Sequence, residues 1–443
     1  MPKKKRKKQH TKPLQPSLKN DAVRLSQVMI VKNEEKNIEK ALTWAKNIAF
    51  EQIVVDTGST DRTVEIAERM GAKVVHFEWV KDFSAAKNFA IEQATGDWIA
   101  FLDADEYYAP NHTKTLPQIL KKLHTNPKIL AMSNPWVQLG DNGKPIEIHQ
   151  QERVFRNIPS LRYVGRIHEH LNIPKHENIL HIDSLDIMHT GYTTEAYSDT
   201  KKASRNAELL RLELESKPND INLKAYLADA LKAEKDEKSL TEADVLYMEV
   251  INSTDNVIGP LKKRAYLNFL NKYSNVPDQI EEHEELCQKA MKENPNDLDY
   301  MCFYASALSK KGEYKKAQEM LLECEAKIPG ANENDATVIL ANPAFLFGQM
   351  VLASQGLGDT ENIIKYATLI LALDKTKYDV LCPYLYTLMR QNPTFGELVE
   401  VLSKIYDMKD PQDLLLIARA AKDIGVIDLA HAIMSLAGNI MNS

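Results

Sequence analysis

The chain of 443 residues is long enough for two or three domains, each with its own core. Its hydrophobic content of 44% and charged content of 27% are ordinary for a soluble globular protein. It has no apolar run of the roughly 20 residues that a bilayer-spanning helix needs, and its start lacks the apolar segment of a signal peptide. We therefore expect a cytoplasmic protein. Its four cysteines form no CxxC pair, which argues against a zinc site or a disulfide framework.

The formal net charge of −6 is unevenly distributed along the chain. Residues 1–24 form a basic tail: eight lysines and arginines and no acid lie among the first 20 residues, so the remainder has a net charge of −14. Such a tail either is disordered and solvated or contacts nucleic acid or an anionic membrane, which would place the protein at the inner membrane face. The acidic remainder argues against nucleic acid as the main ligand, because phosphate binding needs a basic surface.

After the tail, short apolar runs alternate with amphipathic segments. This alternation is typical of βαβ units, whose right-handed crossovers produce a mainly parallel sheet with helices on both faces. We therefore predict an α/β domain over residues 25–198. The expected strands are 26–32, 52–56, 73–77 and 97–102, and the expected helices are 34–49, 61–70 and 83–94.

Polar side chains follow these strands at the edge of the sheet where ligands bind in such folds. Asn33 and Glu34 follow the first strand, Asp56 ends the second, and Asp103 and Asp105 follow the fourth. Carboxylates suit Mg²⁺ or Mn²⁺, and such an ion neutralises the charge of a departing nucleotide diphosphate. No GxGxxG, GxxxxGK[ST], GxSxG or HExxH motif occurs. The sequence therefore predicts a metal-assisted nucleotide site at this edge.

From about residue 199 to residue 443, the chain becomes rich in helix-forming residues, with small residues at regular positions. Residues 298–329 match the helix–turn–helix unit of tetratricopeptide (TPR) repeats, which has about 34 residues. We predict an all-α TPR-like domain there, whose stacked helices bind the acceptor or form a homodimer. Weaker copies of the unit occur at 222–250, around Gly358 and at 414–438.

Four segments of the first half resemble the inverting glycosyltransferases of family 2, which share the GT-A fold. They are VMIVKNEEKNIEKAL, IVVDTGSTDRTVEIA, KDFSAAKNFAIEQATGDWIAFLDADE and VGRIHEH, and the resemblance covers residues 26 to about 195. The helical half resembles the repeat arms of bacterial members, including the peptide S-glycosyltransferases of glycocin biosynthesis. The first hundred residues also resemble core-lipopolysaccharide glycosyltransferases.

The resemblance implies transfer of a sugar from a UDP-sugar, either UDP-glucose or UDP-N-acetylglucosamine, to a peptide or protein acceptor. A lipid-linked glycan is the alternative acceptor. It also implies the residues of the donor site. Asn33 and Glu34 face the nucleoside, Asp56 contacts the base, Lys87 and Asn88 face the nucleotide from a helix, and Asp103 lies on the ribose and metal side.

The same resemblance implies a base and two metal ligands. Glu169, in the segment IHE, matches the general base, although family members often have ED where this chain has HE. Asp105 matches the direct ligand of Mg²⁺ or Mn²⁺, and His189, in MHTGY, matches the histidine that completes the coordination. If these two residues do not have the roles of base and metal ligand, Glu169 is a surface residue and His189 is a histidine that packs in the core. His168 can take the role of either Glu169 or His189.

Four further residues near the motifs have two interpretations each. Arg153 and Arg156 either grip phosphate with their guanidinium forks or form surface ion pairs. Tyr107 and Tyr108 either stack on the sugar or base or pack in the core. Two other function classes remain open from the residues alone: a nucleotidyltransferase, which also pairs acids with a divalent metal, and a non-catalytic repeat adaptor.

Overall fold

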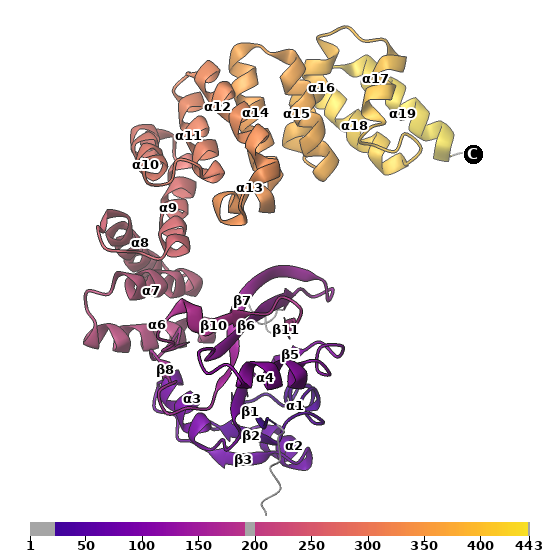
Figure 1. Ribbon diagram of the computed structural model, residues 1–443. Helices are drawn as coiled ribbons and strands as arrows, with labels where there is room; N and C mark the ends of the chain where they lie inside the picture. The colour runs from indigo at the N-terminus through magenta and orange to yellow at the C-terminus, as the bar shows by residue number, and fades with distance from the viewer. Residues whose placement is uncertain (1–22, 191–199, 442–443) are drawn as a thin grey trace, which may run out of the picture. The chain divides into compact units, whose positions relative to one another are not determined.

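A computed structural model describes residues 23–190 and 200–441 of the chain (Figure 1). These residues divide into two compact units, of which the first ends at Asp244 and the second begins at Val245. The basic tail predicted for residues 1–24 lies almost wholly outside the described residues. No helix in the described ranges is both long enough and apolar enough to span a bilayer.

The first four strands form a parallel sheet, as the alternating pattern predicted. β1 lies at the centre of this part and pairs in parallel with β2 and β4, and β2 pairs in parallel with β3. The helix expected over residues 34–49 is shorter, because turns flank its central residues. The elements are β1 (Leu25–Val31), α1 (Ile38–Thr43), β2 (Glu51–Asp56), α2 (Thr63–Arg69), β3 (Lys73–His76), α3 (Phe83–Glu92) and β4 (Trp98–Phe101).

Beyond β4 the sheet continues with strands of both directions, in the order β3-β2-β1-β4-β7-β6-β11-β5, with β10 beside β6. β4 and β6 each pair antiparallel with β7, whereas β11 pairs in parallel with β6 and antiparallel with β5. A separate ladder joins β8 to β9. These elements are β5 (Glu106–Tyr108), α4 (Leu116–His124), β6 (Ala131–Leu139), β7 (Pro145–Arg156), β8 (Tyr163–Val164), β9 (His170–Leu171), η1 (His176–Asn178), β10 (Ile179–His181) and β11 (Ile187–His189).

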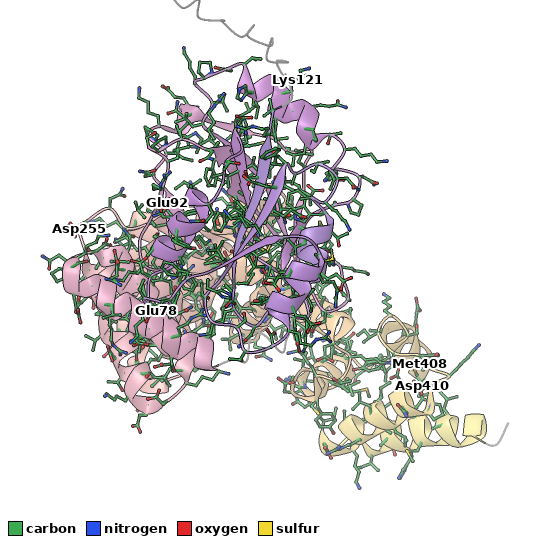
Figure 2. All side chains as sticks on the ribbon, turned by 90° about the horizontal axis from the view of Figure 1, so that it is seen from below. Glu78, Glu92, Lys121, Asp255, Met408 and Asp410 are labelled. Carbon is green, nitrogen blue, oxygen red and sulfur yellow. The ribbon has the colours of Figure 1, made fainter. Side chains whose placement is uncertain are left out.

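Helices cover both faces of the sheet, which confirms the predicted fold class. Successive side chains of β1 point to opposite faces, so Val28 packs with Ile91 of α3, whereas Met29 packs with Ile38 of α1. The outer sides of the helices are charged, as Glu92 on α3 and Lys121 on α4 illustrate (Figure 2). The apolar faces of the helices therefore bury the sheet, and their polar faces meet solvent.

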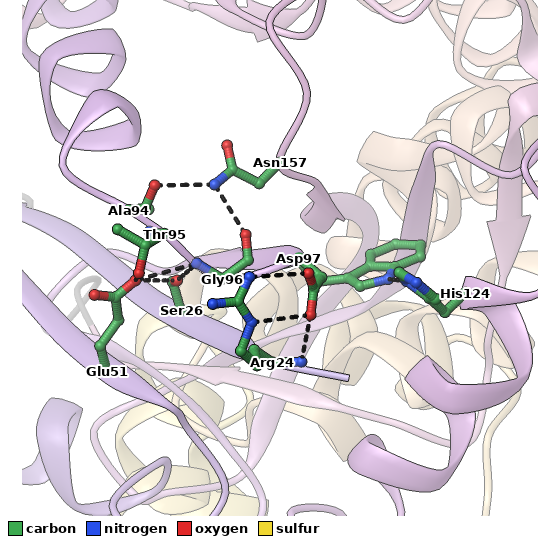
Figure 3. Close-up of polar contacts among 10 residues, drawn as sticks. Arg24, Ser26, Glu51, Ala94, Thr95, Gly96, Asp97, His124 and Asn157 are labelled. Carbon is green, nitrogen blue, oxygen red and sulfur yellow. Dashed lines mark hydrogen bonds and ion pairs between the residues drawn. The ribbon is translucent and has the colours of Figure 1, made fainter. Parts of the chain in front are cut away.

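Hydrogen bonds at the amino edge of the sheet fix β4 against β1 (Figure 3). The backbone N–H and the guanidinium of Arg24 donate to the Asp97 carboxylate at 2.8 and 3.2 Å, and the Gly96 N–H donates to Ser26 Oγ at 2.9 Å. Asn157 at the end of β7 donates to the Gly96 carbonyl at 3.0 Å. Because this edge fixes the register, the opposite ends of β1 and β4 also lie side by side.

Helices follow the sheet, as predicted for the second half of the chain. The first two helices, α6 and α7, pack on each other and belong to the same unit as the sheet. Lys81, before α3, forms an ion pair of 2.5 Å with Glu208 of α6. These helices are α6 (Thr200–Ser216) and α7 (Ile221–Glu234), and α8 (Glu237–Asn252) crosses the division between the units.

The second unit consists of helices that pack as consecutive pairs (Figure 1). The pairs α11/α12, α14/α15 and α18/α19 coincide with three of the predicted repeat copies. Gly356 lets α14 approach Tyr314 of α12, since a Cβ there would lie 2.2 Å from the tyrosine ring. The elements are α9 (Gly259–Ser274), η2 (Pro277–Gln279), α10 (Ile280–Glu293), α11 (Leu298–Lys310), α12 (Tyr314–Lys327), η3 (Ile328–Gly330), η4 (Glu333–Asp335), α13 (Thr337–Ala341), α14 (Pro343–Leu357), α15 (Thr360–Leu373), α16 (Tyr378–Met389), α17 (Phe395–Leu402), α18 (Pro411–Asp423) and α19 (Ile427–Met441).

A buried histidine makes the stability of this helical unit depend on pH. His283 on α10 is fully buried, and neither of its ring nitrogens has a hydrogen-bond partner among the described residues. Burial, with a smaller contribution from Lys310, lowers the pKa of His283 to about 4. The unfolded chain protonates this ring below a pH of about 6.5, so folding loses stability as the pH falls from there towards 4.

We therefore expect His283→Leu to flatten the pH dependence of unfolding. Between pH 7.5 and 4.5, the wild type should lose about 2 kcal/mol relative to the variant, measured by denaturant unfolding at each pH. The comparison with the variant is needed because burial raises the pKa of Asp297 to about 6, which acts in the opposite direction. A difference between the two proteins that is constant with pH would contradict this expectation.

Candidate functional site

A cleft of about 430 Å³ lies where β1, β2 and β4 end, and most of the predicted site residues line it. These residues come from segments that lie far apart in the sequence. They meet because parallel strands end at the same edge of the sheet, as predicted. Four predicted residues are not among the lining residues and are described below. The predicted residues that line the cleft are Glu34, Lys87, Asp103, Asp105, Arg153, Glu169 and His189.

The two predicted metal ligands lie side by side. Asp105 Oδ2 is 3.2 Å from His189 Nε2, because β11 pairs with β5 and the Thr190 N–H donates to the Asp105 carbonyl at 3.1 Å. The other ring nitrogen, Nδ1 of His189, lies 3.0 Å from Gln138 Oε1, and the indole of Trp136 stacks on the imidazole at 4.2 Å. The ring of His189 is therefore held from two sides.

This arrangement fits a divalent cation. A neutral His189 ring whose Nδ1 donates to Gln138 Oε1 offers its Nε2 lone pair on the side of Asp105. A lone pair and a carboxylate oxygen 3.2 Å apart repel each other unless a cation or a proton lies between them. Within the described parts of the chain, no group of three or more His, Cys, Asp or Glu side chains is placed to hold a metal ion.

A buried lysine joins the predicted base to the first aspartate of the DAD segment. Lys87 Nζ lies 2.8 Å from Glu169 Oε1 and 3.6 Å from Asp103 Oδ1, over the rings of Phe101 and Tyr163. Burial alone would lower the pKa of Lys87, but the two carboxylates raise it above its ordinary value. The lysine is therefore charged at neutral pH, and it fixes both acids in the cleft.

Arg153 lies in the cleft but is engaged by two carboxylates. Its guanidinium contacts Asp103 at 3.2 Å and Glu106 at 2.5 Å. Glu106 also accepts from the Trp136 indole at 2.7 Å and from the Asp103 N–H at 3.0 Å. Burial raises the pKa of Glu106 even though Arg153 opposes this. A phosphate group that bound Arg153 would therefore have to replace the contacts of its guanidinium with Asp103 and Glu106.

Glu34 faces the acidic side of the cleft. Its carboxylate accepts from Asn37 Nδ2 at 2.8 Å at the start of α1. Burial raises the pKa of Glu34, and the nearby carboxylates of Asp105 and Asp103 raise it further. Glu34, which follows the first strand, is therefore close enough to the DAD segment for the carboxylates of that segment to raise its pKa.

Two predicted residues lie beside the cleft and shape the turn after β2. The buried Asp56 carboxylate accepts from the N–H groups of Gly58 and Ser59 at 3.2 and 3.0 Å and lies 3.2 Å from His76 Nδ1. Asn33 Oδ1 accepts from the N–H of Thr60, at 2.8 Å. Thr57, which directly follows Asp56, lines the cleft.

Asn88 and Arg156 bind backbone groups away from the cleft. The Asn88 amide exchanges two hydrogen bonds with the backbone of Tyr163, at 2.8 and 2.9 Å, and so fastens α3 to β8. The Arg156 guanidinium binds carbonyls at the end of α4 and in the turn after it. Asn88 and Arg156 are therefore not part of the proposed site. The carbonyls that Arg156 binds are those of Leu123, His124, Asn126 and Ile129.

The two tyrosines after the DAD segment pack in different ways, and neither lines the cleft. Tyr108 is buried against Trp44 at 5.1 Å, and its hydroxyl donates to Asn134 at 3.0 Å. The half-buried ring of Tyr107 lies 3.8 Å from the ammonium of Lys40. Packing, one of the two interpretations of the sequence, therefore accounts for both.

Several residues that line the cleft are not among the predicted site residues. Glu106, the third acid of DADE, gave a visible signal, because it lies three residues after Asp103. The basic residues from α6 gave none, because the change in composition near residue 199 assigned that helix to the repeat domain. Residues of the cleft outside the predicted set include Trp79, Phe83, Glu106, Trp136, Lys202, Arg205 and Asn206.

The sequence of the sheet-containing unit matches a known family. Residues 26–180 match the model described as glycosyl transferase family 2. This range holds β1 to β9 and all predicted site residues except His189. The chain therefore carries a family 2 glycosyltransferase domain with a GT-A-like fold, followed by helices.

Curated relatives resemble slightly less than half of the chain. A TPR repeat-containing protein of Synechococcus elongatus is 34% identical over 229 residues, which are 48% of this chain and 54% of the relative. The SPbeta prophage-derived glycosyltransferase SunS of Bacillus subtilis is 30% identical over 205 residues, 45% of this chain and 48% of SunS. The chain thus spans about half the length of the curated relatives it matches.

Two solved structures align with lower overall similarity. TarS residues 1–349 of S. aureus, in complex with UDP-GlcNAc, is 16% identical, with a TM-score of 0.33, over 54% of this chain and 85% of that one. Glucosyl-3-phosphoglycerate synthase of Mycobacterium tuberculosis, in complex with Mn²⁺, UDP and glucosyl-3-phosphoglycerate, is 26% identical, with a TM-score of 0.23, over 26% of this chain and 44% of that one.

Proposed function

We propose that the chain is an inverting, metal-dependent glycosyltransferase that moves a sugar from a UDP-sugar to a peptide or protein acceptor. One observation carries the proposal: Asp105 and His189 lie 3.2 Å apart in the cleft of a family 2 domain, and that cleft also holds Glu169 paired with Lys87. This combination supports a cation site and a carboxylate base in one cavity, which a metal-assisted inverting transfer would use.

The donor side of the reaction uses the edge of the parallel strands. Asp105 and His189 would hold Mg²⁺ or Mn²⁺, which when bound offsets the negative charge that the leaving diphosphate gains. Lys87 and Arg153 add positive charge in the same cleft. The nucleoside would lie by the exits of β1 and β2, beside Asn33, Glu34 and Asp56, with Asp103 towards the ribose.

The acceptor side depends on Glu169. Its carboxylate takes the proton from the acceptor nucleophile as that atom bonds to the anomeric carbon and the bond from this carbon to the diphosphate oxygen breaks. Attack from the face opposite the diphosphate inverts the configuration of the anomeric carbon. The ion pair with Lys87 at 2.8 Å holds the carboxylate in one position.

A peptide or protein acceptor is the finer part of the proposal. It rests on the resemblance of the helical half to the arms of peptide S-glycosyltransferases, in which stacked helices offer a concave surface for an extended chain. The arm would bind the acceptor or join two copies of the chain. We place the enzyme in the cytoplasm, with the basic tail available for an anionic membrane or nucleic acid.

Donor turnover tests the proposal directly. The full chain is mixed with UDP-glucose or UDP-N-acetylglucosamine, with Mn²⁺, with Mg²⁺ or with a chelator, and released UDP is measured. We expect metal-dependent release with at least one donor. Failure of both donors to bind in calorimetry under every metal condition would contradict the proposal. Product mass spectrometry on a cysteine- and serine-containing peptide and on a lipid-linked glycan then identifies the acceptor class.

A further inference from the structure

We infer that α6 and α7 position the proposed base, and that Tyr226 of α7 is the main positioning residue, acting through His168. The inference rests on the proposed function, because it takes Glu169 as the base. It assigns a catalytic purpose to helices that the sequence pattern grouped with the repeat domain.

The segment that carries Glu169 has an unusual backbone. Gly165 has a φ of 97°, and His168, which directly precedes Glu169, has a φ of 52°. A residue with a side chain adopts this left-handed conformation rarely, because its Cβ crowds the backbone. The turn therefore needs contacts that hold His168 in place, and the orientation of Glu169 depends on them.

The aromatic ring of Tyr226 supplies such a contact. The imidazole of His168 stacks on the phenol ring with centroids 3.9 Å apart and an angle of 17° between the planes. Tyr226 is held by a well-formed helix, since Asp220 caps α7 through the N–H groups of Asn222 and Leu223 at 3.0 and 3.1 Å. The stack therefore fixes a strained loop residue to a rigid element.

Helix α6 holds the same segment two residues earlier. The buried Glu213 accepts from the backbone N–H of Arg166 at 3.4 Å and lies 3.7 Å from its Nε. The guanidinium of Arg166 also donates to the Lys81 carbonyl, at 3.2 Å, and the Phe83 N–H donates to the Arg166 carbonyl, at 2.9 Å. Residues 165–169 are thus held between the start of α3 and the two helices.

Losing the stack should affect chemistry more than donor binding. Without the tyrosine ring, His168 can leave the left-handed region, which turns Glu169 away from its position beside Lys87. Displacement of a catalytic group by about 1 Å can cost roughly 100-fold in rate. The proposed metal ligands Asp105 and His189 lie on or beside the sheet strands, so donor affinity should not depend on Tyr226.

The test compares Tyr226→Ala with Tyr226→Phe, which keeps the ring and removes only the hydroxyl. We expect Tyr226→Ala to lower kcat for UDP release by about 10- to 100-fold with less than about a twofold change in donor KM. The phenylalanine variant should stay near the wild-type kcat. In Glu169→Gln, adding Tyr226→Ala should cause no further loss, because the base is already absent.

A second measurement requires no turnover. Hydrogen–deuterium exchange over residues 165–171 should become faster in Tyr226→Ala and stay unchanged in Tyr226→Phe, at equal thermal stability of the two proteins. Wild-type kcat and unchanged exchange in Tyr226→Ala would overturn the inference. Full activity of Glu169→Gln would instead overturn the choice of base in the proposed function, so the two failures are distinguishable.

Discussion

Asp105→Ala is expected to remove metal-dependent UDP release, lowering kcat/KM by about 1,000-fold. The substitution removes one of the two proposed metal ligands, because Asp105 Oδ2 is the carboxylate oxygen that lies 3.2 Å from His189 Nε2. A divalent ion that stabilises the leaving diphosphate contributes several kcal/mol, and about 4 kcal/mol corresponds to a thousandfold in rate. Steady-state UDP release at saturating Mn²⁺ measures the loss, and titration calorimetry measures the affinity for the ion.

Glu92→Ala is the matched control for this variant. Glu92 is an exposed acid on α3 of the same unit and does not line the cleft (Figure 2). It should keep both wild-type turnover and wild-type affinity for Mn²⁺. If Asp105→Ala kept more than about a tenth of the wild-type rate, a metal ion at this carboxylate would not be needed for the reaction.

Glu169→Gln should lower kcat by about 100- to 10,000-fold, the range typical of the loss of a general base. The amide keeps the size of the side chain and can still accept a hydrogen bond from Lys87. We therefore expect the affinity for the UDP-sugar to stay within about threefold of the wild type. Single-turnover kinetics give the rate constant of the chemical step, and calorimetry gives the affinity for the donor.

The control for the second variant is Glu177→Gln, at an exposed acid of the same domain whose ion pair with Lys175 lies outside the cleft. It should match the wild type in both measurements. Wild-type turnover by Glu169→Gln would show that another group accepts the proton. His168, which the sequence left as an alternative and which lines the cleft, would then be the next residue to replace.

The parallel half of the sheet was predictable because its signals are local. Each strand from β1 to β4 contains a short apolar run, with a polar residue at its end or within two residues after it, and each helix between them has an amphipathic pattern. β6 and β7 gave no comparable signal. The first six residues of β7 are exposed and only its end is buried, so its sequence lacks the pattern of a strand buried along its length.

The site was predictable where it depends on the ends of strands. Asp103 and Asp105 lie near Lys87 and His189 as expected, because the order of the strands brings these segments to one edge. Asn88 was not predictable, because its partner is the backbone of a strand 75 residues away. The same reason applies to Arg156, whose partners are carbonyls at the end of a distant helix.

The pairing of β11 with β5 affects how the protein folds during its synthesis. Thr190 meets the backbone of Asp105 across 85 residues of chain, so the aspartate is synthesised long before the histidine beside it. A chain still on the ribosome, or one cut before Ile187, would carry the complete DAD segment and yet lack the strand that brings His189 to Asp105. Asp105 and His189 therefore come together only after β11 has joined the sheet.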